Sequence, residues 1–202
     1  MSYNAAAKAM AIQTTPAQAA FAHWLVQQLD QPAQPGRQPV SYEFHSPLEH
    51  PDENASAVRV VFLTHTKTPQ ALQEMMQVIR TGAEVQRALP IASEDALVLR
   101  AKPERIALAE WLIAQLDQPA QPGRQAASYS ASTSAYDPSE TAVRVYYLSH
   151  TVPADAIPLA TSLRTSARLN RVFYCSTPGA LAFRGSPDQV AAGEQLIAAA
   201  DK

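Results

Sequence analysis

An internal repeat constrains this chain more than any other feature of its 202 residues. Residues 57–118 and 142–202 align over their whole length with a single one-residue gap, and residues 9–38 repeat residues 96–125. The segment QLDQPAQPGRQ is identical in these last two stretches. Repeats of this length indicate small, similar units in tandem, so the sequence predicts modules rather than one large core.

Each full copy shows the pattern strand, helix, strand, strand, helix. The middle copy begins with β-branched residues at 58–64, and Thr68 followed by Pro69 marks the start of a helix. A hairpin is predicted within 85–100, and a closing helix follows Pro103. The predicted fold class is α+β, with tandem small β-α-β-β-α modules, each a three-stranded sheet with two helices on one face.

The repeat divides the chain into five segments. They are a partial module with a last strand and a closing helix at 1–30, a linker at 31–56, a full module at 57–118, a linker at 119–141 and a full module at 142–202. Proline, glutamine, serine and alanine dominate both linkers, which predicts extended connections. A strand and a helix alone bury little apolar surface, so we expect the partial module to dock on the middle module or on a second copy.

Composition excludes several classes of protein. The formal net charge of −2 gives no broad positive surface for a nucleic-acid duplex or an anionic membrane. Cys175 is the one cysteine, which excludes an intrachain disulfide framework and a multi-cysteine zinc site. The sequence given shows neither a membrane-spanning apolar stretch nor the features of a signal peptide.

The modules resemble the small periplasmic ring-building domains of secretins, the outer-membrane channels of type II and type III secretion and of type IV pili. The resemblance lies in Val58–Leu63 with Val143–Leu148, in Ala96–Arg100 with Ala180–Arg184, and in closing helices that end in Leu-Asp, as at Leu116. It implies a non-catalytic assembly or protein-interaction chain of the periplasm or cell envelope. The implied partners are further copies of the chain or other envelope and secretion proteins. The membrane barrel and its glycine-rich segments have no counterpart in this sequence.

A second hypothesis is RNA binding, because KH domains share this topology. KH domains hold phosphates with a GXXG loop, and that motif is absent. The arginines Arg59 and Arg87 recur as Arg144 and Arg171, but outward arginines on strands usually form a solvated face. We keep a KH-like RNA-binding protein as the alternative.

Candidate catalytic and metal-binding residues are few. His65 and His150 recur after the first strand without a second metal ligand nearby, so we expect them to bond to loop carbonyl groups. Cys175 occupies a core position rather than that of a nucleophile. His45 and His50 lie among carboxylates in the first linker, which allows adventitious cation binding only. The sequence therefore predicts no catalytic residue, no metal site and no cofactor.

Bulky apolar residues on the flank of the closing helices are the candidate interface. They are Phe21, Trp24, Leu108 and Trp111. In the last copy, Ala192 and Gln195 occupy the corresponding positions, as a polar terminal cap requires. We predict that Trp24 and Trp111 contact the following module, its linker or a neighbouring subunit. The alternative is that these side chains widen the core of their own module.

Overall fold

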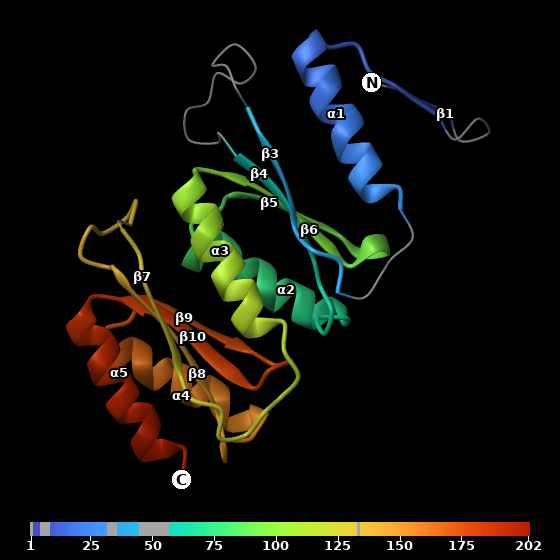
Figure 1. The fold of residues 1–202 in the computed structure, drawn as a ribbon. Helices are drawn as coiled ribbons and strands as arrows, with labels where there is room; N and C mark the ends of the chain where they lie inside the picture. The colour runs from blue at the N-terminus through green and yellow to red at the C-terminus, as the bar shows by residue number, and fades with distance from the viewer. Residues whose placement is uncertain (1, 5–8, 32–35, 45–56, 133) are drawn as a thin grey trace.

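Two antiparallel sheets, each with its own pair of helices, follow one another along the chain (Figure 1). This arrangement is seen in a computed structural model, which describes residues 2–4, 9–31, 36–44, 57–132 and 134–202. A short hairpin and one helix precede the first sheet. The predicted α+β fold with tandem modules is confirmed.

The first sheet has the strand order β3-β4-β6-β5. Its strands are β3 (Val40–Glu43), β4 (Ala57–Phe62), β6 (Ala96–Ala101) and β5 (Arg87–Ile91). Its helices are α2 (Pro69–Gln77), continued by a π-helical turn η1 (Val78–Gly82), and α3 (Pro103–Leu116). The Oγ1 of Thr68 accepts a hydrogen bond of 3.1 Å from the backbone N–H of Ala71, so α2 begins where the sequence predicts.

The second sheet has the matching order β7-β8-β10-β9. Its strands are β7 (Ala127–Ser130), β8 (Ala142–Tyr147), β10 (Ala180–Gly185) and β9 (Arg171–Cys175). Its helices are α4 (Pro153–Ser166) and α5 (Pro187–Ala200). The side chains of Ser186 and Gln189 form a capping box at the start of α5, because each satisfies a backbone N–H of the other.

Each sheet has four strands, so the prediction of three-stranded sheets was wrong. The additional strands β3 and β7 come from the segments 31–56 and 119–141, which the sequence predicts as linkers. Tyr42 pairs with Val58, and Tyr129 pairs with Val143 at the equivalent position of the second sheet. Antiparallel pairing satisfies the outer backbone groups of the first strand of each module, which would otherwise form an open edge.

In both full modules, an aspartate at the end of the closing helix fixes that helix to the loop after the first strand. The carboxylate of Asp117 accepts backbone N–H bonds from Thr64, His65 and Thr66 at 2.6, 2.8 and 2.7 Å. Asp201 accepts the equivalent three bonds in the second module. Burial opposes ionisation of Asp201, but these hydrogen bonds outweigh it and lower the pKa of the carboxyl group. The Leu-Asp ending is therefore a structural feature of the module.

The N-terminal part contains β1 (Ser2–Asn4), β2 (Ala9–Ala11) and α1 (Pro16–Leu29). The repeat aligns β2 and α1 with β6 and α3, and β1 precedes β2 as β5 precedes β6, so this part has two strands where the sequence predicts one. Thr15 and Gln18 form a capping box at the start of α1. Helix α1 lies over β3 of the first sheet (Figure 1). The partial module thus docks on the middle module.

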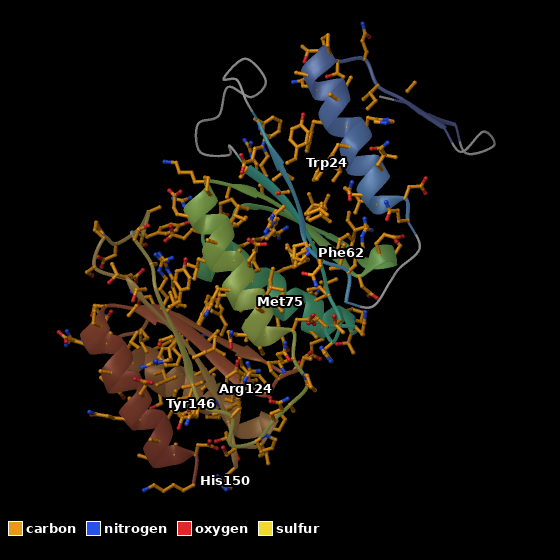
Figure 2. The ribbon with its side chains drawn as sticks, viewed as in Figure 1. Trp24, Phe62, Met75, Arg124, Tyr146 and His150 are labelled. Carbon is orange, nitrogen blue, oxygen red and sulfur yellow. The ribbon has the colours of Figure 1, made fainter. Side chains whose placement is uncertain are left out.

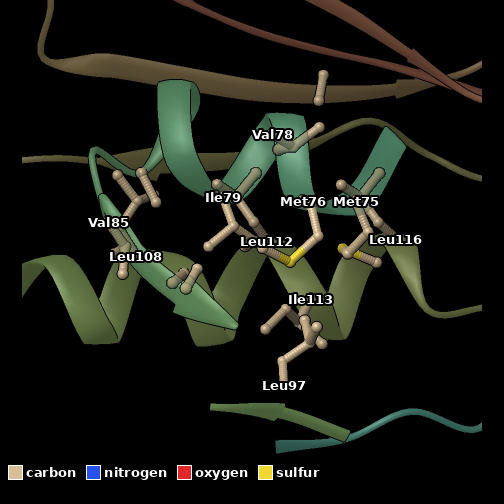
Figure 3. Close-up of a cluster of buried hydrophobic side chains, with 14 of the residues drawn as sticks. Met75, Met76, Val78, Ile79, Val85, Leu97, Leu108, Leu112, Ile113 and Leu116 are labelled. Carbon is tan, nitrogen blue, oxygen red and sulfur yellow. The ribbon is translucent and has the colours of Figure 1, made fainter. Parts of the chain in front are cut away.

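The larger apolar core belongs to both modules. Figure 3 shows its centre, where Met75, Ile79 and Leu112 meet between α2, η1 and α3. The same cluster continues into Val145 and Phe173 of the second sheet. A second cluster lies beneath α4 and α5. Within the described residues, no helix combines the length and the apolar character needed to cross a bilayer.

Candidate module interface

A tryptophan of the closing helix contacts a tyrosine of the next edge strand, with the rings tilted, at two successive joints. The rings of Trp111 on α3 and Tyr129 on β7 lie 5.3 Å apart. Those of Trp24 on α1 and Tyr42 on β3 lie 5.2 Å apart, and Figure 2 shows Trp24 pointing from α1 toward the sheet. Offset aromatic contacts of this kind add to the free energy of apolar burial. The joint between modules is therefore repeated along with the modules.

Arg124 completes the second joint. Its guanidinium carbon lies 4.4 Å from the ring centre of Tyr147, and its Nη2 donates a hydrogen bond of 3.1 Å to Oε1 of Gln115 on α3. The Tyr147 hydroxyl lies 2.9 Å from the same Oε1. Burial raises the pKa of the Tyr147 hydroxyl, although Arg124 opposes the change, so Tyr147 stays protonated and donates.

Arg37 repeats this arrangement at the first joint. Its guanidinium carbon lies 4.1 Å from the ring centre of Phe62, and its Nη1 and Nη2 donate hydrogen bonds to the main-chain and side-chain oxygens of Gln28 at 2.7 and 3.1 Å. Phe62 has no hydroxyl group, so one bond of the second joint has no counterpart here. Both arginines belong to the identical segment QLDQPAQPGRQ, which explains why they adopt the same position.

Apolar contact between the two modules covers the face of the second sheet that α4 and α5 leave open. Val78 of η1 and Met75 of α2 lie in one cluster with Phe173 and Cys175 of β9. Figure 3 shows Val78 on the side of η1 that faces the strands of the second sheet. Phe173 keeps 9% of its surface exposed. Burial of large side chains on this face stabilises the contact by the hydrophobic effect.

A buried ionic network lies at one end of this contact. Glu84 of the first module, 2% exposed, accepts hydrogen bonds from Nη1 of Arg171 at 2.7 Å and from Oγ of Ser134 at 2.6 Å. The backbone N–H of Ala135 donates to its second oxygen at 2.9 Å. Burial opposes ionisation of Glu84, but these bonds and the charge of Arg184 outweigh it and lower the pKa of the carboxyl group. Glu84 is therefore a buried carboxylate anion.

Arg184 connects the network to the main chain of both modules. Its Nη1 donates to the carbonyl oxygen of Gly82 at 2.9 Å, and its Nε donates to the carbonyl oxygen of Glu140 at 2.9 Å. The Glu140 carboxylate lies 3.0 Å from Nη2 of Arg171. A buried charge without its partner costs several kcal/mol. These contacts therefore favour one orientation of the two modules.

A second polar contact between the modules is made from within α2. Glu74 accepts hydrogen bonds of 2.7 Å from both the backbone N–H and the hydroxyl of Ser176, in the turn after β9. Burial raises the pKa of the nearby Tyr174 hydroxyl, and the negative charge of Glu74 adds to this effect. Carboxylates of the first module thus hold the second sheet at two separated points.

The four predicted interface residues lie at these joints. Trp24 and Trp111 contact the edge strands, and the Phe21 ring lies 5.2 Å from that of Tyr42. Leu108 is buried and lines a pocket between the modules with Tyr129. Their role in binding other chains stays a prediction. Sequence reasoning missed the ionic network, although the recurrence of Arg87 at position 171 and of Arg100 at position 184 is a signal for it.

Two of the recurrent arginines lie inside their own modules. Arg59 forms an ion pair with Glu110 of α3, and Arg144 Nε lies 2.6 Å from Glu194 of α5. Both strands therefore direct these side chains toward their own helices. The interpretation of the strand arginines as a solvated outer face was wrong for this pair, and wrong also for Arg171, which is 6% exposed.

The remaining chemically active side chains have structural contacts. Nδ1 of His65 lies 3.0 Å from the carbonyl oxygen of Asp117, as expected for a histidine at a strand end. Cys175 is buried, and burial raises the pKa of its thiol far above the ordinary range, which opposes thiolate formation. Among the residues that the structure describes, no group of histidine, cysteine and acidic side chains has the geometry of a metal site. His45 and His50 lie outside the described residues.

Comparison with known proteins gives matches among solved structures only. No family model and no curated protein matches the chain. One match is the crystal structure of the N-terminal domain of the secretin XcpQ from Pseudomonas aeruginosa, with 20% identity over 72% of this chain and 62% of that chain and a TM-score of 0.29. The chain is similar to a secretin N-terminal domain. A dimeric cysteine mutant of the same domain matches with 16% identity over 95% of this chain and 80% of that chain, with a TM-score of 0.31.

Proposed function

We propose that this chain is a non-catalytic assembly protein whose modules stack on one another and on further modules of a secretin-type secretion channel. One observation carries the proposal. The helices of one module cover the open sheet face of the next, with Glu84 buried against Arg171 at 2.7 Å. The chemistry of the chain is therefore that of a protein interface, formed by burial and ion pairing.

The interface is directional, which suits assembly. It joins two different surfaces, the helical face of one module and the sheet face of the next. Interfaces between unlike surfaces generate rings when the rotation closes and continuous stacks when it does not. Each joint also includes the tryptophan and arginine contacts described above. A chain of such modules has the means to build a layered assembly.

The KH-like alternative lacks support from the side chains that RNA binding requires. Arg171 and Arg184 are buried against carboxylate and carbonyl oxygens, while Arg59 and Arg144 form ion pairs within their modules. Arginines that hold protein acceptors have lost the exposure through which they would bind phosphates. The contacts of these residues therefore favour assembly over RNA binding.

The proposed location is the periplasm or cell envelope, where ring-building modules of secretins operate. The proposed partners are further copies of the chain or other envelope and secretion proteins. No cofactor enters this proposal, because the contacts that support it are made by side chains and main-chain groups of the chain itself.

Light scattering tests the assembly proposal. The mass of the full chain is measured over a wide range of protein concentrations, with or without envelope proteins that are encoded nearby. A mass that rises with concentration, or a stable complex with such a protein, supports assembly. The proposal is contradicted if the chain stays monomeric, does not bind these proteins, and binds RNA with an affinity that falls steeply with added salt.

A matched pair of variants makes this test specific. Trp24→Ala alters the joint at the N-terminal helix, whereas Ile157→Ala alters an exposed apolar residue of α4 away from both joints. We expect Trp24→Ala to shift the association to higher protein concentration and Ile157→Ala to leave it unchanged. Equal behaviour of both variants would show that association does not use the repeated joint.

A further inference from the structure

Helix α1 of the partial module is covered on one side only. Its Phe21 and Trp24 rings contact Tyr42 of β3. Val26 lies on the other side of the helix and is 43% exposed, whereas its equivalent on α3, Ile113, is 3% exposed. The side of α1 that faces away from β3 therefore lies open.

The open side of α1 has the residue types of a module core. Three of its residues recur unchanged on α3, namely Ala22 as Ala109, Leu25 as Leu112 and Leu29 as Leu116. On α3, these three side chains are at most 1% exposed, because they pack beneath α2 and η1 (Figure 3). The equivalent side of α1 thus corresponds to the surface on which the first helix of a full module packs.

Asp30 is the carboxylate of the partial module that corresponds to Asp117 and Asp201. Each of those two accepts three backbone N–H bonds from the loop between the first strand and the first helix of its module. Asp30 is exposed, and no group among the residues that the structure describes donates to its carboxylate. Within the same residues, β2 pairs with β1 alone, whereas its equivalent β6 pairs with both β4 and β5.

We infer that this open side of the partial module is a docking site for a strand, loop and helix of the repeat type, supplied by a separate polypeptide. The inference rests on the proposed assembly function, because it names one contact of that assembly. The strand pairs with the free edge of β2, the helix covers Val26 and Leu29, and the loop N–H groups bind Asp30. The first strand, loop and helix of both full modules make these three contacts.

A second folded copy of this chain has no such segment to spare. In each copy, residues 57–82 and 142–166 contain the first strand and the first helix of the two full modules. Their loops are bound by Asp117 and Asp201. The occupant is therefore a segment that another protein leaves without a closing helix of its own.

His23 sets one feature of the occupant. Glu110 of α3 and Glu194 of α5 form ion pairs with Arg59 and Arg144 of the first strands. The corresponding residue of α1 is His23, which supplies no negative charge for an arginine. The arriving strand therefore carries an uncharged or acidic residue where the first strands of the full modules carry arginine.

Thiol labelling at position 26 measures docking on the full chain. The probe is residues 57–82 with Arg59→Gln, fused to a soluble carrier protein and added to the Val26→Cys chain. We expect saturating probe to slow labelling by a soluble thiol reagent about tenfold or more, because docking buries the side chain. The buried Cys175 contributes little background. The control Gln27→Cys should react equally with and without probe, because its equivalent on α3, Ala114, is exposed.

Asp30→Asn tests the contact with the loop. This change keeps the shape of the side chain but removes the charge that strengthens its hydrogen bonds to backbone N–H groups. Half-protection at position 26 should then need about tenfold more probe. Equal protection in the presence and absence of the Asp30 carboxylate would contradict the assigned position of the loop.

A tethered form of the probe keeps the test decisive. The same segment is joined before Ser2 by a flexible linker, which raises its effective concentration to about millimolar. Labelling at position 26 that stays fast both with free probe and in the tethered chain overturns the inference. Slow labelling in the tethered chain alone contradicts supply by a separate polypeptide.

Two further outcomes separate this inference from the proposed function. Labelling of Val26→Cys that slows as the concentration of the chain alone rises would show that a second copy covers the site, which contradicts the stated occupant. Protection by the probe, combined with a mass that never exceeds one chain and one probe, would support the docking site and contradict further assembly.

Discussion

The two sheets share strand order and register, but among the residues that the structure describes the second sheet is covered more completely by its neighbour than the first. On the second sheet, α2, η1 and α3 of the preceding module cover the open face, and Arg171 and Arg184 become buried. On the first sheet, α1 covers the β3 side, while Leu89 on β5 stays 58% exposed. Equivalent positions are therefore buried in one module and exposed in the other, as Phe173 and Leu89 show.

This difference shows that burial in a tandem protein depends on the neighbouring module as much as on the residue itself. Helices α1 and α3 each have 14 residues and end in Leu-Asp, yet α3 has six buried residues and α1 has none. Helix α3 lies between two sheets, whereas α1 contacts one. A helix that is covered on more faces by neighbouring modules thus has more buried residues and contributes more to stability.

The largest expected difference between the sheets concerns the paired arginines. Arg171→Leu leaves Glu84 and Glu140 buried without their main cation, which should lower the free energy of unfolding by about 3–5 kcal/mol. Arg87 is exposed, so water weakens any contact of its side chain, and Arg87→Leu should alter the free energy of unfolding by about 1 kcal/mol or less. Urea unfolding of both variants measures the difference. Similar losses in the two variants would mean that the first sheet also has a covered face.

The next largest difference in stability is expected between Phe173 and Leu89, the apolar residues at equivalent positions of β9 and β5. Phe173→Ala removes a buried ring from the contact with η1 and should cost about 3 kcal/mol. Leu89→Ala removes a side chain that is mostly exposed, and should cost under about 1 kcal/mol. Thermal unfolding of the two variants beside the parent chain provides the measurement. A cost for Leu89→Ala that matches that of Phe173→Ala would contradict the open face.

Local signals in the sequence were sufficient for most helix starts. Pro69 after Thr68, and the capping boxes at Thr15 and Ser186, set the helix starts that the structure shows. Pro158 is a contrary case, because a proline inside a helix normally breaks it, yet α4 runs for 14 residues. Pro158 is exposed, so water can satisfy the carbonyl group that its missing N–H leaves without a helical partner.

Features that depend on contacts between residues far apart in the chain could not be predicted from the sequence. Strands β3 and β7 have four residues each, which is too short to show a clear alternation of apolar and polar residues. They are strands because they pair with β4 and β8. Glu84 lies in a short turn where a charged residue is normally solvated, and its partner Arg171 is 87 positions away. The flank position of the tryptophans was evident from helical spacing, but the tyrosines that they contact lie in segments predicted as linkers.

A smaller difference is expected at the two tryptophans. Trp111→Ala removes a half-buried ring between two modules and should cost about 2 kcal/mol. Within a single chain, Trp24→Ala weakens the attachment of α1 and should cost about 1 kcal/mol. Hydrogen exchange separates the two effects. Trp24→Ala should increase exchange within α1 only, and Trp111→Ala within α3 and β7. Faster exchange throughout the chain in Trp24→Ala would show that α1 stabilises more than its own joint.

The smallest expected effect is the dependence of the free energy of unfolding on pH, to which one carboxyl group in each module contributes. Glu84 and Asp201 both have a lowered pKa in the folded chain, so their contributions to stability are present at neutral pH. These contributions fall as the pH drops below the ordinary carboxyl range of about 4 toward the folded values. Glu84→Gln should reduce the acid sensitivity of the contact between the sheets, and Asp201→Asn that of the loop after β8. Unfolding by urea at several pH values between neutral and acid measures both. If Glu84→Gln retained the full acid sensitivity of the parent chain, protonation of Glu84 would not be what weakens the covered sheet.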